Sequence, residues 1–283
     1  MAKLDTLQNK VVWITGASSG LGKALAGEFA LQGAQVILTS RRFEELEEVR
    51  VGLLHPDQHL SVVADITNQE QVQEAYEQIL KAKGRIDWLI NNAGLSQRAL
   101  IQDTTMATER AIMEVDYFSQ VALTKTVLPT MLKQKSGRVV FVSSVAGLLG
   151  TQYRASYSAA KAAIHMWANS LRAEVADQGV EVSVIFPGFV KTNVSFNALN
   201  GAGQPQGHQD EAIENGLEAD VFAEQSVKAL MQGQEYIVVG GTKEKLGVMV
   251  SRMSPKLLYK MIRKTKVKIK KRFRRAKLME KPA

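Results

Sequence analysis

The sequence predicts an α/β protein with a doubly wound parallel sheet of about seven strands. Short apolar runs alternate along the chain with longer helical patterns, which is typical of βαβ units with right-handed crossovers. Most runs are almost continuously apolar, as strands that helices cover on both faces require. We expect strands at residues 11–15, 35–40, 60–64, 88–91, 138–143, 181–186 and 236–239, and helices at 20–32, 43–54, 68–83, 106–135, 157–178 and 219–232.

The first expected strand runs into a glycine-rich turn, and a helical pattern follows it directly. The turn reads Thr15-Gly16-Ala17-Ser18-Ser19-Gly20-Leu21-Gly22. Strand, glycine turn and helix in this order are the dinucleotide fingerprint of a Rossmann-type fold, although the spacing here is TGxxxGxG and not GxGxxG. The first glycine permits the tight turn, and the later glycines let a pyrophosphate approach the backbone at the helix N-terminus.

A tyrosine and a lysine stand four residues apart, at Tyr157 and Lys161, which places them on one face of an expected helix. A fixed ammonium beside a phenol favours the phenolate, so the hydroxyl can donate or accept a proton near neutral pH. Ser144, thirteen residues before the tyrosine, offers a hydroxyl that can hold the oxygen of a carbonyl or an alcohol. A tyrosine and a lysine at this spacing often occur by chance on a helix. The pair indicates a catalytic site only because a glycine turn precedes it in the chain.

Further motifs follow the glycine turn in a fixed order: Asp65-Ile66-Thr67, Asn91-Asn92-Ala93-Gly94, Ser143-Ser144, Tyr157 to Lys161, and Pro187-Gly188-Phe189-Val190-Lys191-Thr192. In this order they resemble the short-chain dehydrogenase/reductase family, over residues 8–240. Residues 115–125 and 186–194 look closest to the branch of 11β-hydroxysteroid dehydrogenase-like and dehydrogenase/reductase member 7B-like enzymes. The resemblance implies hydride transfer between a nicotinamide and a carbonyl or alcohol, with Ser144, Tyr157 and Lys161 as catalytic residues.

The resemblance also implies where the cofactor binds. Asp65 resembles the residue that contacts adenine, and Asn91 with the Ala93-Gly94 backbone resembles the wall beside the adenosine ribose. Thr192 resembles the residue that bonds the nicotinamide carboxamide. The other cofactor-binding residues that it implies are Gly16, Ser18, Ser19, Gly20, Leu21, Gly22, Ile66, Asn92, Tyr157, Lys161, Pro187, Gly188 and Val190.

The end of the second expected strand indicates NADP(H) as the cofactor. An NAD-binding fold usually has Asp or Glu there to accept hydrogen bonds from the ribose 2′-hydroxyl, whereas this chain reads Thr39-Ser40-Arg41-Arg42. A guanidinium can hold a 2′-phosphate with two hydrogen bonds. We expect Arg41 to do so, with Ser40 or Arg42 assisting. The alternative is that both arginines are solvated at a helix start, which leaves the missing acid unexplained.

Asp116 departs from the family pattern. The family often has an asparagine in a VNxxG-like stretch as a fourth catalytic residue, and this chain reads Val115-Asp116-Tyr117-Phe118-Ser119. If the backbone carbonyl alone matters there, the aspartate is harmless. If the side chain faces the site, its carboxylate offsets the cation of Lys161. Our hypothesis is that activity survives with a shifted pH profile.

The substrate is expected to be a lipophilic, steroid- or lipid-like ketone or alcohol, on the analogy of the branch. Residues 193–220 take the place of the family's substrate loop, and the glycine-rich stretch 200–207 is a candidate lid. Two alternatives stay open: a 3-oxoacyl carrier-protein reductase-like enzyme, and a non-catalytic nucleotide-binding scaffold at a membrane surface. The resemblance implies a homodimer or homotetramer.

A basic tail follows the last expected strand, so we expect a catalytic domain over 1–241 and a helical extension over 242–283. Residues 252–283 contain 14 Lys and Arg against one Glu, although the whole chain has a net charge of only +8. Apolar residues share a helical face there, so residues 252–281 can lie on an anionic membrane surface. The alternative is a solvated tail. Nucleic acid is a poor candidate partner, because the tail has little aromatic interleaving and the rest is acidic.

The bulk composition fits an ordinary globular enzyme. The chain is 45% apolar and 23% charged, and it has no cysteine, which excludes disulfides and thiolate chemistry. The four histidines lack metal-ligand spacing, so we expect no metal site. Neither an apolar signal region nor a run of about 18 apolar residues occurs, so we expect a cytoplasmic protein, with peripheral membrane contact through the tail.

Overall fold

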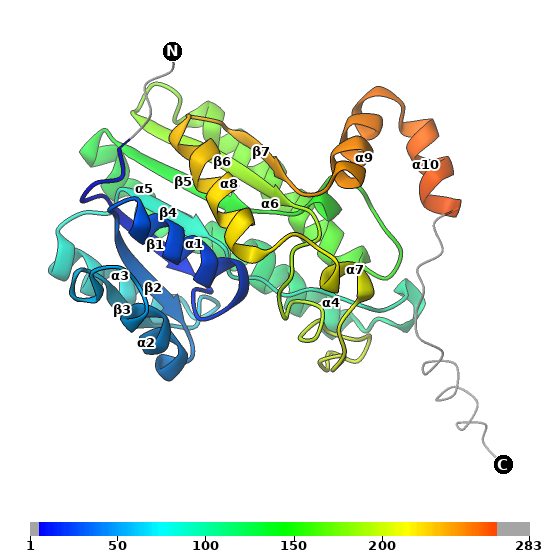
Figure 1. The fold of residues 1–283 in the computed structure, drawn as a ribbon, viewed down its shortest axis with the longest axis horizontal. Coiled ribbons are helices and arrows are strands. Elements are labelled where there is room, and N and C mark those ends of the chain that lie inside the picture. Colours follow the sequence, from blue (N-terminus) through cyan, green and yellow to red (C-terminus); the bar gives the residue numbers. More distant parts are fainter. Residues whose placement is uncertain (1–5, 265–283) are drawn as a thin grey trace.

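Seven parallel strands form one sheet at the centre of the structure, a computed structural model that describes residues 6–264 (Figure 1). They lie in the order β3-β2-β1-β4-β5-β6-β7, so the order reverses beside β1, where the chain crosses to β4. Ligands bind outside the carboxyl ends of the strands at such a point. The strands are β1 (Val11–Thr15), β2 (Gln35–Ser40), β3 (Leu60–Val63), β4 (Trp88–Asn91), β5 (Gly137–Val142), β6 (Val180–Pro187) and β7 (Tyr236–Val239).

Helices cover both faces of the sheet (Figure 1). One face carries α1 (Gly20–Leu31), α2 (Phe43–Val51) and α8 (Ala219–Met231), and the other carries α3 (Gln69–Lys83), α5 (Ser119–Gln134) and α6 (Ala155–Glu174). Each face has its own apolar core, because the strand side chains alternate between the two layers. Three short 3-10 turns complete the connections: η1 (Pro56–Gln58), η2 (Ile101–Asp103) and η4 (Val145–Gly147).

The seven predicted strands and their parallel arrangement are confirmed. Four strands have the predicted bounds at β1, β2, β4 and β7. Of the other three, β3 differs by one residue at one end, and β5 and β6 differ by one residue at each end. The apolar runs were a reliable signal because β1 and β4 are buried along their whole length. A strand that is buried on both faces has apolar residues at successive positions, so it stands out in the sequence as a continuous apolar run.

The helix predicted over 106–135 is interrupted. The structure has α4 (Met106–Met113), then one π-helical stretch, η3 (Glu114–Phe118), and then α5. A π turn inserts an extra residue, which rotates the following side chains, and such turns often occur at functional sites. Here the turn brings Asp116 into the protein interior, where its side chain is fully buried.

Beyond β7 the chain forms two further helices, α9 (Thr242–Met253) and α10 (Pro255–Lys264), which pack against each other. Figure 1 shows this pair standing at one end of the molecule. Pro255 begins the second helix and disfavours helical continuation of the first at Ser254. The predicted basic tail over 252–281 lies partly outside the described residues. The boundary at residue 241 between a catalytic domain and a helical extension stays a prediction. Within residues 6–264, no helix combines the length and apolarity that a membrane span requires.

Candidate active site

A cleft of about 1390 Å³ opens at the carboxyl ends of the strands and collects the predicted motifs. The glycine turn, the arginine pair after β2, the Asp65 stretch, the turn after β4, and the serine, tyrosine and lysine all contribute to its wall. Three predicted residues, Gly22, Asn91 and Asp116, do not line the cleft and lie behind its wall. Asn91 is buried, and its amide donates to the hydroxyl of Thr124 at 3.1 Å, on α5.

The glycine turn is shaped to leave backbone exposed to a ligand. Gly16 and Gly20 adopt positive φ angles of 65° and 55°, which favour glycine. A Cβ on Gly22 would lie 2.2 Å from the carbonyl oxygen of Gly16, so only glycine fits there. The amide of Asn92 donates to the carbonyl of Thr15 at 2.8 Å, which ties the turn to the end of β4. This cradle fits the pyrophosphate of a dinucleotide.

Two groups at the adenosine end hold Asp65. The backbone N–H of Thr67 donates to its carboxylate at 2.9 Å and the Thr67 hydroxyl donates at 2.7 Å. The guanidinium of Arg41 lies 3.8 Å away. Partial burial acts to raise the pKa of Asp65, but the Thr67 hydrogen bonds and the charge of Arg41 outweigh it and hold the pKa below its usual value.

Arg42 reaches across the cleft to the glycine turn. Its guanidinium donates to the hydroxyl of Ser18 at 3.0 Å and pairs with Glu45 at 3.1 Å. Its backbone N–H donates to the hydroxyl of Ser40 at 3.2 Å. The side chains of Arg41 and Arg42 are 74% and 56% exposed and both line the cleft, so both guanidinium groups are accessible to a phosphate.

The serine, the tyrosine and the lysine meet in the middle of the cleft. The ammonium of Lys161 donates to the backbone carbonyl of Val142 at 3.1 Å and lies 5.8 Å from the centre of the Tyr157 ring. The hydroxyl of Ser144 accepts the N–H of Ala146 at 3.1 Å, which points its oxygen along the start of η4. Lys161 is buried, with its side chain only 4% exposed.

Ser143 faces away from the substrate position. Its hydroxyl donates to the backbone carbonyl of Lys161 at 2.8 Å, which binds the end of β5 to α6. Neighbouring residues at a strand end point to opposite faces. The Ser143 hydroxyl is thus engaged by the Lys161 carbonyl, and the assignment of Ser144 as the catalytic serine stays a prediction.

Asp116 contacts the lysine from behind. One carboxylate oxygen accepts the N–H of Leu95 at 2.7 Å and lies 3.8 Å from the Lys161 ammonium. The second oxygen is buried with no hydrogen-bond partner among the described residues. Burial raises the pKa of Asp116 to about 6, against the opposing effects of Lys161 and the Leu95 N–H. The side chain of Asp116, and not its backbone alone, therefore faces Lys161.

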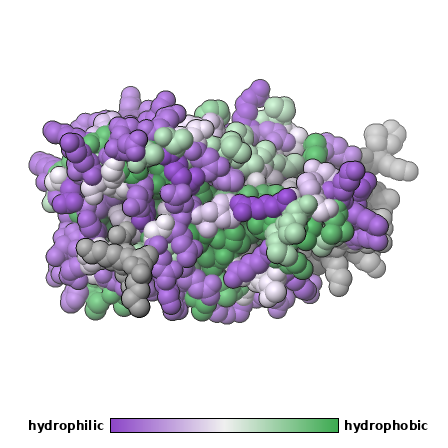
Figure 2. Space-filling model, turned by 90° about the horizontal axis from the view of Figure 1, so that it is seen from above, coloured by the Kyte–Doolittle hydropathy of each residue, from purple (hydrophilic) through white to green (hydrophobic). Residues whose placement is uncertain are grey.

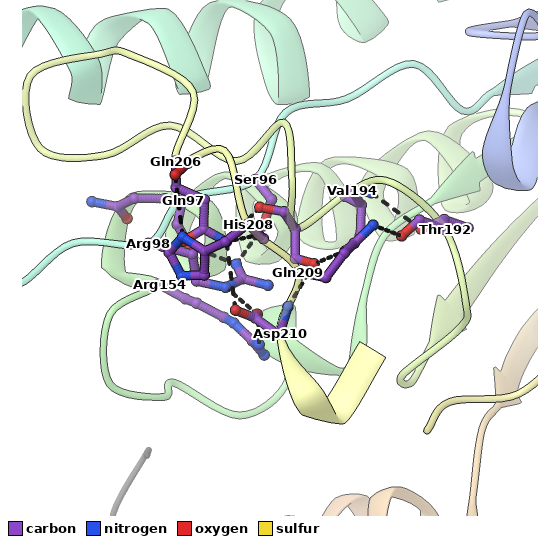
Figure 3. A network of polar contacts seen from close by, with 11 residues as sticks. Ser96, Gln97, Arg98, Arg154, Thr192, Val194, Gln206, His208, Gln209 and Asp210 are labelled. Atoms are coloured by element: carbon purple, nitrogen blue, oxygen red, sulfur yellow. Dashed lines mark hydrogen bonds and ion pairs between the residues drawn. The ribbon is translucent and has the colours of Figure 1, made fainter. Parts of the chain in front are cut away.

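Three charged residues escaped the sequence analysis: Arg98 and Arg154, which line the cleft, and Asp210, which pairs with both. Arg98 donates to the carboxylate of Asp210 at 2.5 Å, and Arg154 reaches the same oxygen at 3.5 Å; Figure 3 shows both converging on it. Arg98 and Asp210 are 112 residues apart, so no local pattern connects them. The position of Arg154, three residues before Tyr157, was the one hint in the sequence that it lies near the site.

The stretch predicted as a lid is tied to the body of the protein. The carbonyl of Gly201 accepts the N–H of Thr105 at 2.9 Å and the hydroxyl of Thr108 at 3.1 Å, at the start of α4. Asn200 accepts two backbone N–H groups from within the stretch, those of Ala202 and Gln204. These contacts give residues 200–204 a defined position at the mouth of the cleft.

The comparisons with known proteins agree with this geometry. Residues 10–201 match the family model described as short chain dehydrogenase. The chain is 38% identical over 270 residues to a dehydrogenase/reductase SDR family protein 7-like of Drosophila melanogaster, covering 94% of this chain and 83% of that protein. It is also 38% identical over 269 residues to dehydrogenase/reductase SDR family member 7B of Danio rerio, covering 93% and 87%.

A solved structure supports the fold. A short-chain dehydrogenase from Streptomyces avermitilis superposes with a TM-score of 0.77 at 29% identity, covering 91% of this chain and 98% of that chain. The names of both animal relatives agree with the branch that residues 115–125 and 186–194 indicated.

Proposed function

The chain belongs to the short-chain dehydrogenase/reductase family, and on this premise we propose that it is an NADP(H)-dependent oxidoreductase of lipophilic ketones and alcohols. The observation that carries the proposal is the meeting of Ser144, Tyr157 and Lys161 in one cleft with the glycine turn. An intact proton-transfer group beside a nucleotide cradle favours an enzyme over the scaffold alternative.

The residues divide the work of a carbonyl reduction. NADP(H), when bound, supplies the hydride that reaches the carbonyl carbon or accepts it in the reverse direction. The Ser144 hydroxyl holds the substrate oxygen, and the Tyr157 hydroxyl gives that oxygen its proton. The Lys161 ammonium, fixed by the Val142 carbonyl, stabilises the negative charge left on the phenol oxygen. In alcohol oxidation each step runs backwards.

The preference for NADP(H) over NAD(H) rests on charge at the end of β2. Two guanidinium groups, on Arg41 and Arg42, line the cleft there, and Ser40 adds a hydroxyl. The carboxylate of Asp65 is engaged by Thr67 and Arg41, so its charge is partly offset. A 2′-phosphate would find two cations at this position, whereas a 2′-hydroxyl would find no carboxylate directly after β2.

The first test is a titration of the purified protein with NADPH and with NADH, followed by nicotinamide fluorescence. We expect NADPH to bind at least about 10-fold more tightly, since one charge-assisted phosphate contact contributes roughly 1.5–3 kcal/mol. Arg41→Ala and Arg42→Ala should each weaken NADPH binding and leave NADH binding nearly unchanged. A preference for NADH would overturn the cofactor assignment, and binding of neither would favour the scaffold alternative.

We also propose that this is a cytoplasmic protein that contacts an anionic membrane surface through its last helices. Exposed apolar side chains on α9 and α10, such as Met249, Met253 and Leu257, stand among lysines and arginines. In Figure 2, apolar side chains are exposed on the right half of the molecule, where α9 and α10 lie in Figure 1. Apolar area and positive charge together favour anionic lipid. The homodimer or homotetramer stays a prediction, supported by the exposure of Phe118 and Met166.

A further inference from the structure

Two arginines and one aspartate form a charged cluster in the part of the cleft beyond the catalytic tyrosine. Arg98 comes from the loop after β4, Arg154 directly precedes α6, and Asp210 directly precedes α7 (Glu211–Glu214). The side chains of Arg98 and Arg154 are only 11% and 18% exposed. Both arginines line the cleft.

The cluster carries more positive than negative charge. Arg98 satisfies much of its hydrogen bonding locally, donating to the Ser96 hydroxyl at 2.8 Å and the Gln97 carbonyl at 2.6 Å as well as to Asp210. Arg154 has a single long contact with Asp210, at 3.5 Å, and its guanidinium lies 5.3 Å from the centre of the Phe189 ring. One carboxylate therefore serves two cations.

The environment of Arg154 shows the same imbalance. Burial lowers its pKa to about 10, the charge of Arg98 adds to this effect, and Asp210 and Tyr157 only partly oppose it. A buried guanidinium with several donors left over and a second cation beside it is a favourable position for an anion. A bound carboxylate or phosphate would supply the missing negative charge.

The position of the cluster relates it to the reacting group. Arg154 directly precedes α6, and Tyr157 lies three residues later in the first turn of that helix. The tyrosine is close enough to act on the electrostatics of the Arg154 guanidinium. A ligand whose carbonyl oxygen meets Tyr157 would bring a substituent a few bonds away to the arginine pair.

We propose that Arg98 and Arg154 form an anion subsite, which binds a carboxylate or phosphate group that the substrate carries a few bonds from its carbonyl carbon. The inference rests on the proposed function and narrows its substrate class to amphiphilic oxo-anions. The anion itself does not react: hydride adds to the carbonyl carbon, Tyr157 protonates the oxygen, and the charged group stays unchanged. Leu95, Phe189 and Leu217 in the same cleft leave apolar surface for the remaining chain.

The competing explanation is that the cluster only holds the substrate loop in place. The other carboxylate oxygen of Asp210 accepts a hydrogen bond from the Gln206 amide at 3.5 Å, and its backbone N–H donates to the Ser195 hydroxyl at 3.1 Å. Asp210 therefore does join the loop of residues 193–220 to the two arginines. A purely structural role would make the arginines matter equally for charged and neutral ligands. This difference makes the proposal testable.

The experiment measures binding and not turnover. Isothermal titration calorimetry of the full chain, with saturating NADP⁺, would compare octanoate, octyl phosphate and octanol, which share one alkyl chain. The same titrations would be run on Arg154→Met, Arg98→Met and the control Arg110→Met, which changes an exposed arginine on α4. Arg154→Lys tests whether the planar fork, beyond the charge, is needed.

We expect at least one anion to bind about 10-fold or more tightly than octanol, since a hydrogen bond to a charged group contributes roughly 1.5–3 kcal/mol. Arg154→Met and Arg98→Met should each remove that advantage and change octanol affinity less than about twofold. The tighter of the two anions identifies carboxylate or phosphate as the source. Equal affinities of the wild type for all three ligands would overturn the subsite, as would parallel losses for octanol in the variants.

The design separates this inference from the proposed function. Calorimetric binding of the anion needs no hydride transfer, and titrations without cofactor can be run beside it. If NADPH fails to bind but the arginines still select the anion, the enzyme proposal fails and the subsite stands. If NADPH binds and neutral ketones are reduced without any preference for anions, the reverse holds.

Discussion

The carboxylate of Asp116 lies 3.8 Å from the ammonium of Lys161, and the two side chains are only 0% and 4% exposed. The π turn over Glu114–Phe118 makes this approach possible, because it directs Asp116 inward from a helix that otherwise continues past it. Lys161 thus has a potential anion on one side and the Tyr157 ring on the other. The charge state of Asp116 sets how much of the lysine cation the phenol experiences.

The first prediction concerns the pH dependence of the reaction in Asp116→Asn. Because the pKa of Asp116 is about 6, its carboxylate is charged through the neutral range and offsets the Lys161 cation. The neutral amide of Asp116→Asn no longer offsets the Lys161 cation, which then favours the phenolate of Tyr157 more strongly. The rate of alcohol oxidation should therefore begin to rise at a lower pH than in the wild type. Initial rates from pH 5 to 10 with saturating NADP⁺ would check it. An unchanged profile would exclude an electrostatic role for this side chain.

The same variant should be more stable at neutral pH. The pKa of Asp116 rises on folding from 3.8 to about 6, so the folded state holds this proton more tightly than the unfolded chain. Its stabilising contribution is complete below about pH 4 and disappears as the pH rises through about 6. Asp116→Asn should therefore exceed the wild type by up to about 3 kcal/mol at pH 7, with little difference near pH 4.

Urea unfolding at several pH values measures that gap. Asp177→Asn, which changes an exposed aspartate after α6, serves as the control and should show no such pH dependence. A constant difference between Asp116→Asn and the wild type from pH 4 to pH 7 would contradict the prediction.

Substitution of the neighbouring residues Ser143 and Ser144 should affect kcat very differently. Ser144→Ala removes the proposed catalytic hydroxyl and should lower kcat by about 100-fold or more. It also leaves the Ala146 N–H without its acceptor, so it should lower the free energy of unfolding by about 1 kcal/mol. Ser143→Ala removes a buried hydrogen bond to the Lys161 carbonyl, so it should lower the free energy of unfolding by about 1 kcal/mol and preserve most activity. Paired kinetics and urea unfolding would test both, and a reversed pattern would exchange their roles.

Two glycines of α1 should respond in opposite ways to alanine. Gly22→Ala places a methyl group 2.2 Å from the Gly16 carbonyl oxygen, so it should disrupt the nucleotide cradle and weaken NADPH binding by about 10-fold or more. Gly27→Ala meets no atom within 4 Å, and should stabilise the helix by about 0.5–1 kcal/mol. NADPH titration and thermal unfolding give the two readouts. Normal NADPH affinity in Gly22→Ala would show that the turn is not the cradle.

The membrane contact predicts a loss of lipid binding in Leu257→Gln combined with Met253→Gln. These apolar side chains are 48% and 78% exposed at the junction of α9 and α10, where insertion into lipid would bury them. Co-sedimentation with phosphatidylserine vesicles at low salt should fall severalfold. Leu31→Gln, at an exposed apolar position on α1, should leave it unchanged. Equal sedimentation of all three proteins would refute the contact through these helices.

The strands and the glycine turn were readable from sequence because their signals are local. Val11 to Ile14 is an unbroken apolar run, and Gly16, Gly20 and Gly22 stand where the backbone needs them. The order of the motifs along the chain also predicted that Ser144 and Lys161 line one cleft with the glycine turn, and they do, since parallel strands all end at the same edge of the sheet.

The sequence by itself thus determined the sheet, the glycine turn and the expected positions of Ser144, Tyr157 and Lys161, because each depends on residues close together or at strand ends. Only the tertiary structure decided how charges meet across the cleft. The π turn that directs Asp116 toward Lys161 shows no break in the helical pattern of residues 106–135. The cluster of Arg98, Arg154 and Asp210 joins segments up to 112 residues apart, and such contacts depend on how loops pack over a finished sheet.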